Sequence, residues 1–176
     1  AKKAVEELNN DLGIRTVMLT GDRKAAAKNI ADTLGIAEFH AELLPQNKVE
    51  IVEQELAKEN GKRSVAFVGD GINDAPVIAR ADVGLAMGGL GSDAAIEAAD
   101  IVIMDDRIEK VPLAVRIARR TVRIAWQNII FALAVKLATL LLGALGYAEM
   151  WMALVADVGV CLIAILNAMR AMHPGK

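Results

Sequence analysis

The chain has 176 residues, of which 55% are hydrophobic but only 3% aromatic, and its formal net charge is −2. That charge, and the lack of a basic run interleaved with aromatic residues, give no reason to expect a nucleic-acid partner. The single cysteine, Cys161, excludes an internal disulfide and fits a reducing compartment or a membrane interior. Residues 1–10 are charged and helical in pattern, unlike a signal peptide, and we expect a piece of a longer protein.

Short strand-like and helix-like segments alternate through residues 1–107, where charged and apolar residues are mixed. Such alternation indicates βαβ units, so we expect an α/β domain with a doubly wound parallel sheet covered on both faces. The expected helices are 4–12, 24–34, 46–58, 76–81 and 93–99, and the expected strands are 15–19, 36–39, 65–68, 83–86 and 101–104.

The stretch 65–76, Val-Ala-Phe-Val-Gly-Asp-Gly-Ile-Asn-Asp-Ala-Pro, is an apolar strand that ends in glycines and carboxylates. Asp70 and Asp74 are spaced across the turn so that both can face one oxygen-ligand cation such as Mg²⁺. Glycines allow a sharp turn and a close approach of the backbone to a ligand. The alternative is an ordinary βα turn, in which Asn73 and Asp74 cap the helix that begins at Pro76.

Charges nearly disappear after residue 123. Residues 124–143 and 150–169 each supply about 20 apolar positions, enough to cross a hydrocarbon core of roughly 30 Å. We therefore expect a linking helix over 108–123 and, over 124–176, a transmembrane helical hairpin with a short tail. A buried hairpin in a soluble protein is the alternative, but two such spans in succession are uncommon outside membranes.

Basic residues lie at the two ends of the hairpin and not in its turn. By the positive-inside rule, both ends are then cytoplasmic. We expect an integral protein of the plasma (inner) membrane, in contact with lipid, whose α/β domain and C-terminus are cytosolic. The residues concerned are Arg116, Arg119, Arg120 and Arg123 before the first span, Arg170 and Lys176 after the second, and Glu149 alone in the turn.

Two ionisable residues, Lys136 and Asp157, lie within the spans, and each costs about 2.5 to 3.5 kcal/mol to insert. Each is seven residues from the outer boundary, at Gly143 or Met150, so both lie roughly 10 Å deep and can pair. We interpret them as part of a cation pathway; the alternative is a snorkelling lysine and a tolerated aspartate. Cys161, one turn from Asp157, is more simply a small packing residue.

Several segments resemble P-type ATPases in residue identity, order and spacing. Residues 91–100, Gly-Ser-Asp-Ala-Ala-Ile-Glu-Ala-Ala-Asp, resemble the heavy-metal branch of that family. The resemblance covers the whole chain and identifies residues 1–107 as the C-terminal portion of a cytosolic phosphorylation domain of the haloacid-dehalogenase type. The other segments are 18–22 (Met-Leu-Thr-Gly-Asp), 44–48 (Leu-Pro-Gln-Asn-Lys), 68–76 (Val-Gly-Asp-Gly-Ile-Asn-Asp-Ala-Pro) and 86–88 (Ala-Met-Gly).

The resemblance implies a role for each residue at the strand ends. Thr20 hydrogen-bonds the phosphoryl group, Lys48 stabilises the charge around a phosphorylated aspartate, and Asp70 binds Mg²⁺. A cation, a lysine and neutral donors provide the electrostatic stabilisation that phosphoryl transfer needs. The remaining catalytic positions are Gly21, Asp22, Asn73 and Asp74, with Asp74 also a Mg²⁺ ligand.

The membrane pair resembles that of the zinc, cadmium and lead exporters, in which Asp157 would bind the transported ion and Lys136 would be its internal counter-ion. Copper(I) pumps carry a Tyr-Asn pair in the first of these helices, whereas no tyrosine precedes Asn128 here. A hard aspartate ligand also suits a divalent ion. The implied function is export of Zn²⁺, Cd²⁺ or Pb²⁺, driven by ATP with Mg²⁺ through an aspartyl phosphate; a copper(I) pump is the alternative.

The 176 residues contain no Asp-Lys-Thr-Gly-Thr segment, which bears the phosphorylated aspartate in this family. The nucleotide-binding domain, the actuator domain and a Cys-Pro-Cys helix would also precede Ala1. We therefore expect the chain to be inactive alone and to act with the N-terminal remainder of the same pump. A non-catalytic, membrane-anchored fragment is the second alternative.

Overall fold

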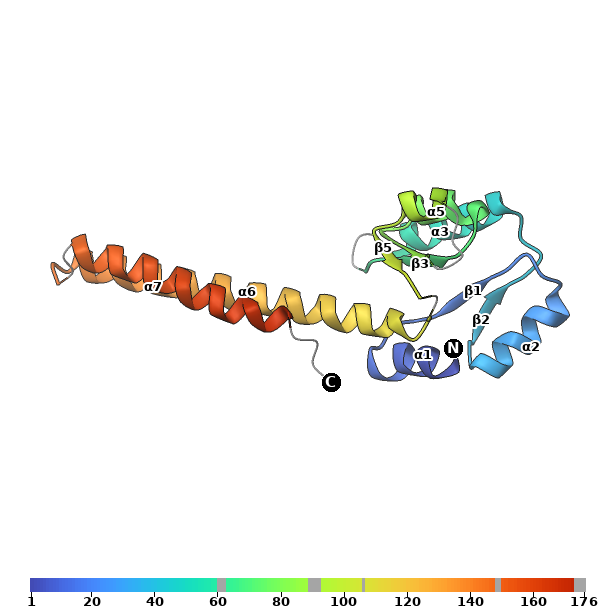
Figure 1. Cartoon of the computed structure of the whole chain (residues 1–176), viewed down its shortest axis with the longest axis horizontal. Helices are drawn as coiled ribbons and strands as arrows, with labels where there is room; N and C mark the ends of the chain where they lie inside the picture. Colours follow the sequence, from blue (N-terminus) through green and yellow to red (C-terminus); the bar gives the residue numbers. More distant parts are fainter. Residues whose placement is uncertain (60–62, 89–92, 106, 148–149, 173–176) are drawn as a thin grey trace. The chain divides into compact units, whose positions relative to one another are not determined.

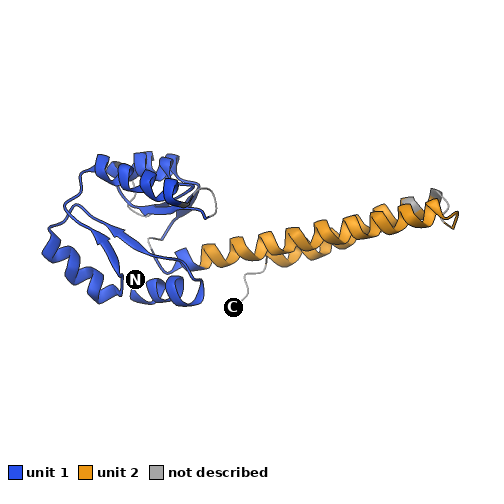
Figure 2. Cartoon of the chain, turned by 180° about the vertical axis from the view of Figure 1, so that it is seen from behind, with its two compact units in different colours: residues 1–112 blue, residues 113–176 orange. Residues whose placement is uncertain are grey.

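The computed structural model describes residues 1–59, 63–88, 93–105, 107–147 and 150–172. The expectations placed on Gly91, Ser92, Glu149 and Lys176 fall outside these ranges. The chain divides into two compact units, Ala1–Pro112 and Leu113–Lys176, which are coloured separately in Figure 2.

Unit 1 contains every helix and strand expected before residue 107, with ends that differ by a residue or two. Gly35 adopts the left-handed conformation (φ +74°) that ends α2 after Leu34. The elements are α1 (Lys2–Glu6), which continues as a π-helical segment (Glu7–Asp11), β1 (Val17–Leu19), α2 (Lys24–Leu34), β2 (Glu38–His40), α3 (Pro45–Glu59), β3 (Ala66–Gly69), a 3₁₀ turn (Ile72–Asp74), α4 (Ala75–Arg80), β4 (Val83–Met87), α5 (Asp93–Ala98) and β5 (Ile101–Ile103).

The strands of unit 1 are all parallel, which confirms the parallel α/β prediction. They form two sheets, β1–β2 and β3–β4–β5, where a single sheet was expected. Among the described strands, β1 pairs with β2 alone and β3 pairs with β4 alone. The other edge of each of these two strands has no described partner strand. Figure 1 shows α1 and α2 on one side of the strands and α3 and α5 on the other.

Both faces of the β3–β4–β5 sheet are covered. On one face, Ile78 of α4 and Ala95 of α5 pack with Ala86 of β4. The next residue towards the N-terminus, Leu85, points to the opposite face, because side chains alternate along a strand. There it packs in a cluster that Leu8 covers. A parallel sheet buried on both faces leaves the strand ends as the accessible positions.

Two helices, α6 (Lys110–Ala144) and α7 (Met150–Met169), form a helical hairpin, followed by a 3₁₀ turn at Arg170–Met172. Unit 2 contains this hairpin from Leu113 onward. Gly146 adopts φ +78°, and the Tyr147 N–H donates to the Leu142 carbonyl over 2.9 Å, which ends α6. The helices Lys110–Ala144 and Leu154–Met172 are long and apolar enough to cross a membrane, and hardly any of either is buried within the chain. The helix α7 covers residues 150–169, the second apolar segment of the sequence.

Candidate functional site

The end of β3 is shaped by a glycine. A Cβ at Gly69 would lie 2.8 Å from the Cβ of Asp74, so a residue with any side chain would push these segments apart. The glycine therefore lets the turn fold back until Asp74 packs against the strand end. The Asp74 N–H donates to the Gly71 carbonyl over 3.0 Å. Asp70, at the tip itself, is exposed.

Lys48 of α3 meets Asp74 at this point. Its Nζ lies 2.7 Å from Asp74 Oδ1, and only 17% and 12% of the two side chains are exposed. Asp74 occupies the N-cap position of α4, yet its side chain makes no capping hydrogen bond. Its carboxylate is engaged by a lysine that is 26 residues away in the chain. This contact argues against the simple helix-cap interpretation of the stretch.

The end of β1 carries a second polar turn. Thr20 Oγ1 donates to Asp22 Oδ2 over 3.0 Å and accepts from the Asp22 N–H over 3.1 Å. The Leu43 N–H donates to the Thr20 carbonyl over 3.1 Å. Since α3 begins just after Leu43, this bond ties the β1 tip to the helix whose Lys48 contacts Asp74. Among the described residues, no side-chain hydrogen bond joins Thr20 to Asp70 directly.

The carboxylates at the β3 tip fit a Mg²⁺ ion. In the part of the chain that the structure describes, the exposed Asp70 side chain makes no hydrogen bond or ion pair, whereas Asp74 is held by Lys48. Mg²⁺ typically uses one or two carboxylates and completes its shell with water and substrate phosphate. The described residues contain no cluster of three or more His, Cys, Asp or Glu side chains, which a fully protein-built cage would use.

In the hairpin, Lys136 and Asp157 are both exposed, and neither side chain forms an ion pair or a hydrogen bond with a described residue. Their levels nevertheless agree. Asn128 Nδ2 donates to the Ala164 carbonyl across the helices over 3.1 Å. Lys136 lies eight residues after Asn128, and Ala156, the neighbour of Asp157, lies eight residues before Ala164. Because the two helices run in opposite directions, Lys136 and Asp157 lie at about the same level.

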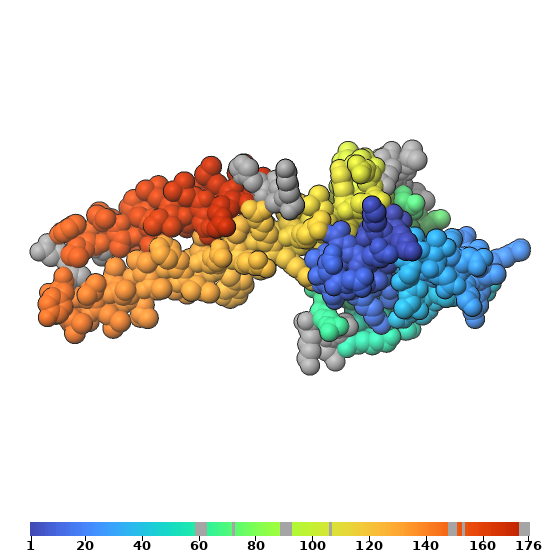
Figure 3. All heavy atoms as spheres, turned by 90° about the horizontal axis from the view of Figure 1, so that it is seen from below, coloured from blue at the N-terminus to red at the C-terminus, as the bar shows by residue number. Residues whose placement is uncertain are grey.

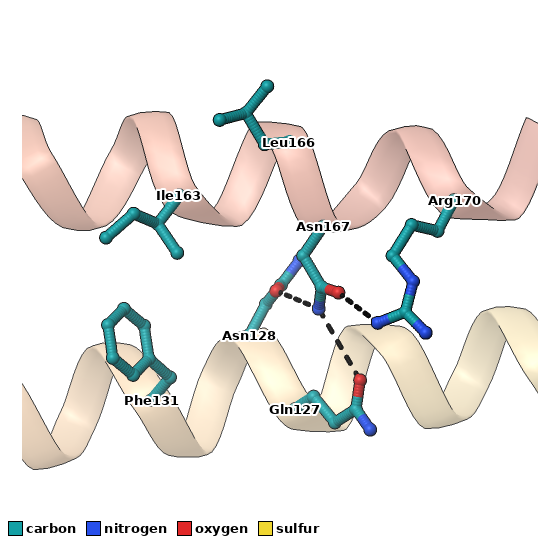
Figure 4. Close-up of a pocket in the computed structure, with 7 residues that line it drawn as sticks. All are labelled: Gln127, Asn128, Phe131, Ile163, Leu166, Asn167 and Arg170. Atoms are coloured by element: carbon teal, nitrogen blue, oxygen red, sulfur yellow. Dashed lines mark hydrogen bonds between the residues drawn. The ribbon is translucent and has the colours of Figure 1, made fainter.

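Sequence reasoning missed a group of side chains between α6 and α7, which we call the interhelical polar cluster: Gln127, Asn128, Asn167 and Arg170 (Figure 4). Asn167 Nδ2 donates to Asn128 Oδ1 over 2.8 Å, and Arg170 Nη1 donates to Asn167 Oδ1 over 3.0 Å. A weaker contact of 3.5 Å joins Asn167 Nδ2 to Gln127 Oε1. The sequence offered one indication of this cluster: it has amide side chains within two apolar spans. Polar residues in such spans tend to face another helix.

Comparisons with known proteins agree on one group of relatives. A family model described as haloacid dehalogenase-like hydrolase matches residues 1–82. The chain is 58% identical over 174 residues to a cadmium, zinc and cobalt-transporting ATPase of Bacillus subtilis, covering 98% of this chain and 25% of that protein. It is 55% identical over 171 residues to a zinc-transporting ATPase of Synechocystis, covering 97% of this chain and 23% of that protein.

A solved structure supports the same relationship. The crystal structure of a zinc-transporting PIB-type ATPase in the E2.Pi state matches with a TM-score of 0.89 and 40% identity, covering 98% of this chain and 27% of that one. The chain thus spans about a quarter of the length of the relatives it matches.

Proposed function

We propose, because this chain is homologous along nearly its whole length to heavy-metal P-type ATPases, that it is the C-terminal part of an ATP-driven exporter of divalent heavy-metal ions. The complete pump would use ATP and Mg²⁺ and form an aspartyl phosphate, with Zn²⁺, Cd²⁺ or Pb²⁺ as its cargo. The observation in the structure that carries the proposal is the Lys48–Asp74 pair beside the exposed Asp70.

The strand ends would stabilise the transferred phosphoryl group. Lys48, fixed by Asp74, presents a positive charge that needs no reorganisation when negative charge develops nearby. Thr20 has a hydroxyl to donate to a phosphoryl oxygen once it turns from Asp22. Asp70, assisted by Asp74, would hold a Mg²⁺ ion, which when bound neutralises phosphoryl charge.

The rest of the pump would complete the sheet. In the described structure, β1 and β3 each have one edge without a partner strand. Unpaired edges in a buried parallel sheet leave backbone groups without hydrogen bonds. We infer that a strand from the N-terminal remainder pairs with them and brings the aspartate that becomes phosphorylated.

The hairpin would contribute half of the transport site. Lys136 and Asp157 are exposed on the hairpin, and a charge facing lipid costs about 2.5 to 3.5 kcal/mol. Other helices of the pump would therefore cover them. Asp157 would be an oxygen ligand for the divalent ion, and Lys136 would neutralise it after release, a hard ligand set that favours zinc or cadmium over copper(I).

The distribution of arginines supports an orientation of the hairpin in its membrane, which we infer to be the plasma (inner) membrane. Arg116, Arg119, Arg120 and Arg123 precede the apolar part of α6, and Arg170 follows α7. Basic residues favour the cytoplasmic side. The α/β unit and the C-terminus would then be cytosolic.

The test is ATP hydrolysis by the complete pump in liposomes, measured with Zn²⁺, Cd²⁺, Pb²⁺ or Cu(I). We expect stimulation by the divalent ions and its loss in Asp157→Ala. Cys161→Ala is the matched control, one helical turn away, and should retain stimulation. Full zinc stimulation of Asp157→Ala would contradict the ligand role. Stimulation by Cu(I) alone would identify a copper pump. If no ATP is hydrolysed with any of these ions, the result would favour a non-catalytic role.

A further inference from the structure

We propose that Asn128 and Asn167 fix the register of α6 against α7 and so hold Lys136 and Asp157 at one level of the membrane. They would be positioning residues, since neither contacts the two charged side chains. The register itself follows from the hairpin alone. Its consequence for metal binding rests on the proposed function.

The hydrogen bonds of the interhelical polar cluster follow one another, and both asparagine side chains have partners. Asn167 donates to Asn128 over 2.8 Å and accepts from Arg170 over 3.0 Å, while Asn128 donates onward to the Ala164 carbonyl. Both asparagines are half-buried, whereas most of the hairpin surface is exposed. In hydrocarbon an amide without a partner is unfavourable, so a slip that separates this pair would be penalised at both residues.

The remainder of the interface specifies register weakly. Its half-buried positions are small or apolar, among them Val135 on α6 and Gly159 and Val160 on α7. Because lipid removes the hydrophobic driving force between helices, these positions can favour one alignment over the next only through van der Waals packing. A single buried asparagine is known to set register in coiled coils, where the apolar seam alone would tolerate several alignments.

The consequence of a slip is a mismatch between the charged residues. Moving α7 by one helical turn displaces Asp157 by about 5.4 Å relative to Lys136. Such a displacement exceeds the tolerance of metal coordination, in which ligand distances are fixed to within about 0.2 Å. Lys136 follows Asn128 by eight residues, so the polar cluster lies roughly 12 Å from Lys136 along the helix.

Cysteine cross-linking tests the register in the complete pump without depending on transport. In a complete pump from which Cys161 and all other cysteines have been removed, Val135→Cys with Val160→Cys reports the native register, because Val135 lies seven residues after Asn128 and Val160 seven residues before Asn167. Val135→Cys with Ala164→Cys reports a slip of about one turn. We expect Asn128→Leu/Asn167→Leu to reduce the native cross-link at least threefold and increase the slipped one.

Thr121→Leu is the matched control. It replaces another polar residue of α6, whose hydroxyl donates to Ile117 of the same helix, and it should leave the cross-link unchanged. An unchanged native cross-link in the double asparagine variant would overturn the proposal, whether or not the pump transports metal.

Zinc dependence tests the positioning role. We expect Asn167→Leu to raise the zinc concentration for half-maximal ATP hydrolysis about tenfold, and Asn167→Gln to restore part of the affinity. The double variant should be at least as impaired as the single one, because it also removes the hydrogen bond from Asn128 to the Ala164 carbonyl. A slipped cross-link with unchanged zinc dependence would contradict positioning. A wild-type pump that no divalent metal stimulates would instead refute the proposed function, while the cross-link would still decide the register.

Discussion

The two units of the chain treat their charges in opposite ways. In unit 1, Lys48 and Asp74 come from distant segments and neutralise each other in a largely buried contact. In unit 2, Lys136 and Asp157 share a level but stay exposed, and side-chain amides donate the hydrogen bonds that join the two helices among the described residues. The difference suggests that the α/β unit already organises much of its site, whereas the hairpin fixes only the alignment of groups that other helices would complete.

The largest expected effect comes from breaking the buried pair of unit 1. Lys48→Met leaves the Asp74 carboxylate buried without a partner, which should destabilise the unit by about 3 kcal/mol. It should also lower phosphoryl turnover of the complete pump roughly 100-fold, because a preorganised charge is lost. Thermal unfolding and phosphoenzyme assays on the purified pump measure the two effects.

Arg80→Met is the control for that experiment. It removes an ion pair of similar length, 2.7 Å from Arg80 Nε to Glu53 Oε1, whose side chains are about half exposed. Exposed pairs contribute only about 0 to 1 kcal/mol. Equal loss of stability in the two variants would show that burial of the Lys48–Asp74 pair is unimportant.

A smaller effect should follow from filling the space beside Asp74. In Gly69→Ala the new methyl group would meet Asp74 Cβ at 2.8 Å and Phe67 Cε1 at 3.1 Å. Relieving this overlap should cost about 1 to 3 kcal/mol and reduce turnover roughly tenfold by moving Asp74 away from Lys48. At Gly71 the nearest atom is 3.9 Å away, so Gly71→Ala should behave like the wild type. Similar losses in both variants would contradict the close-approach argument.

The sequence predicted the order of elements well because their end signals are local. Gly35 ends α2, and continuous apolarity marks the α7 span. Strand adjacency is not local, so the division into two sheets was missed. The depth of Lys136 and Asp157 in the membrane could be predicted by counting residues from the span ends. The direction in which the two side chains point could not be predicted in this way. Each residue turns by about 100° around the helix, and the interface was unknown until Asn128 and Asn167 located it.

The smallest predicted effect concerns an ion-pair group at the edge of unit 1. A hydrogen bond from Lys58 over 2.6 Å, together with the charge of Arg15, holds the pKa of Glu55 below its ordinary value of 4.5. A lowered pKa in the folded state means that ionised Glu55 stabilises the fold at neutral pH and that this contribution is lost as the pH falls below about 4.5.

Glu55→Gln should therefore reduce the free energy of unfolding by about 0.5 to 1 kcal/mol at pH 7. The difference from the wild type should shrink as the pH falls from 4.5 through the lowered pKa. Thermal unfolding of the purified pump across this range measures it, and a difference that persists unchanged at the acidic end would refute the assignment. The interhelical polar cluster contains no carboxylate, so the alignment of α6 against α7 should not change across the same range. Acid would then weaken the charged contacts of unit 1 and leave the neutral alignment of the hairpin intact.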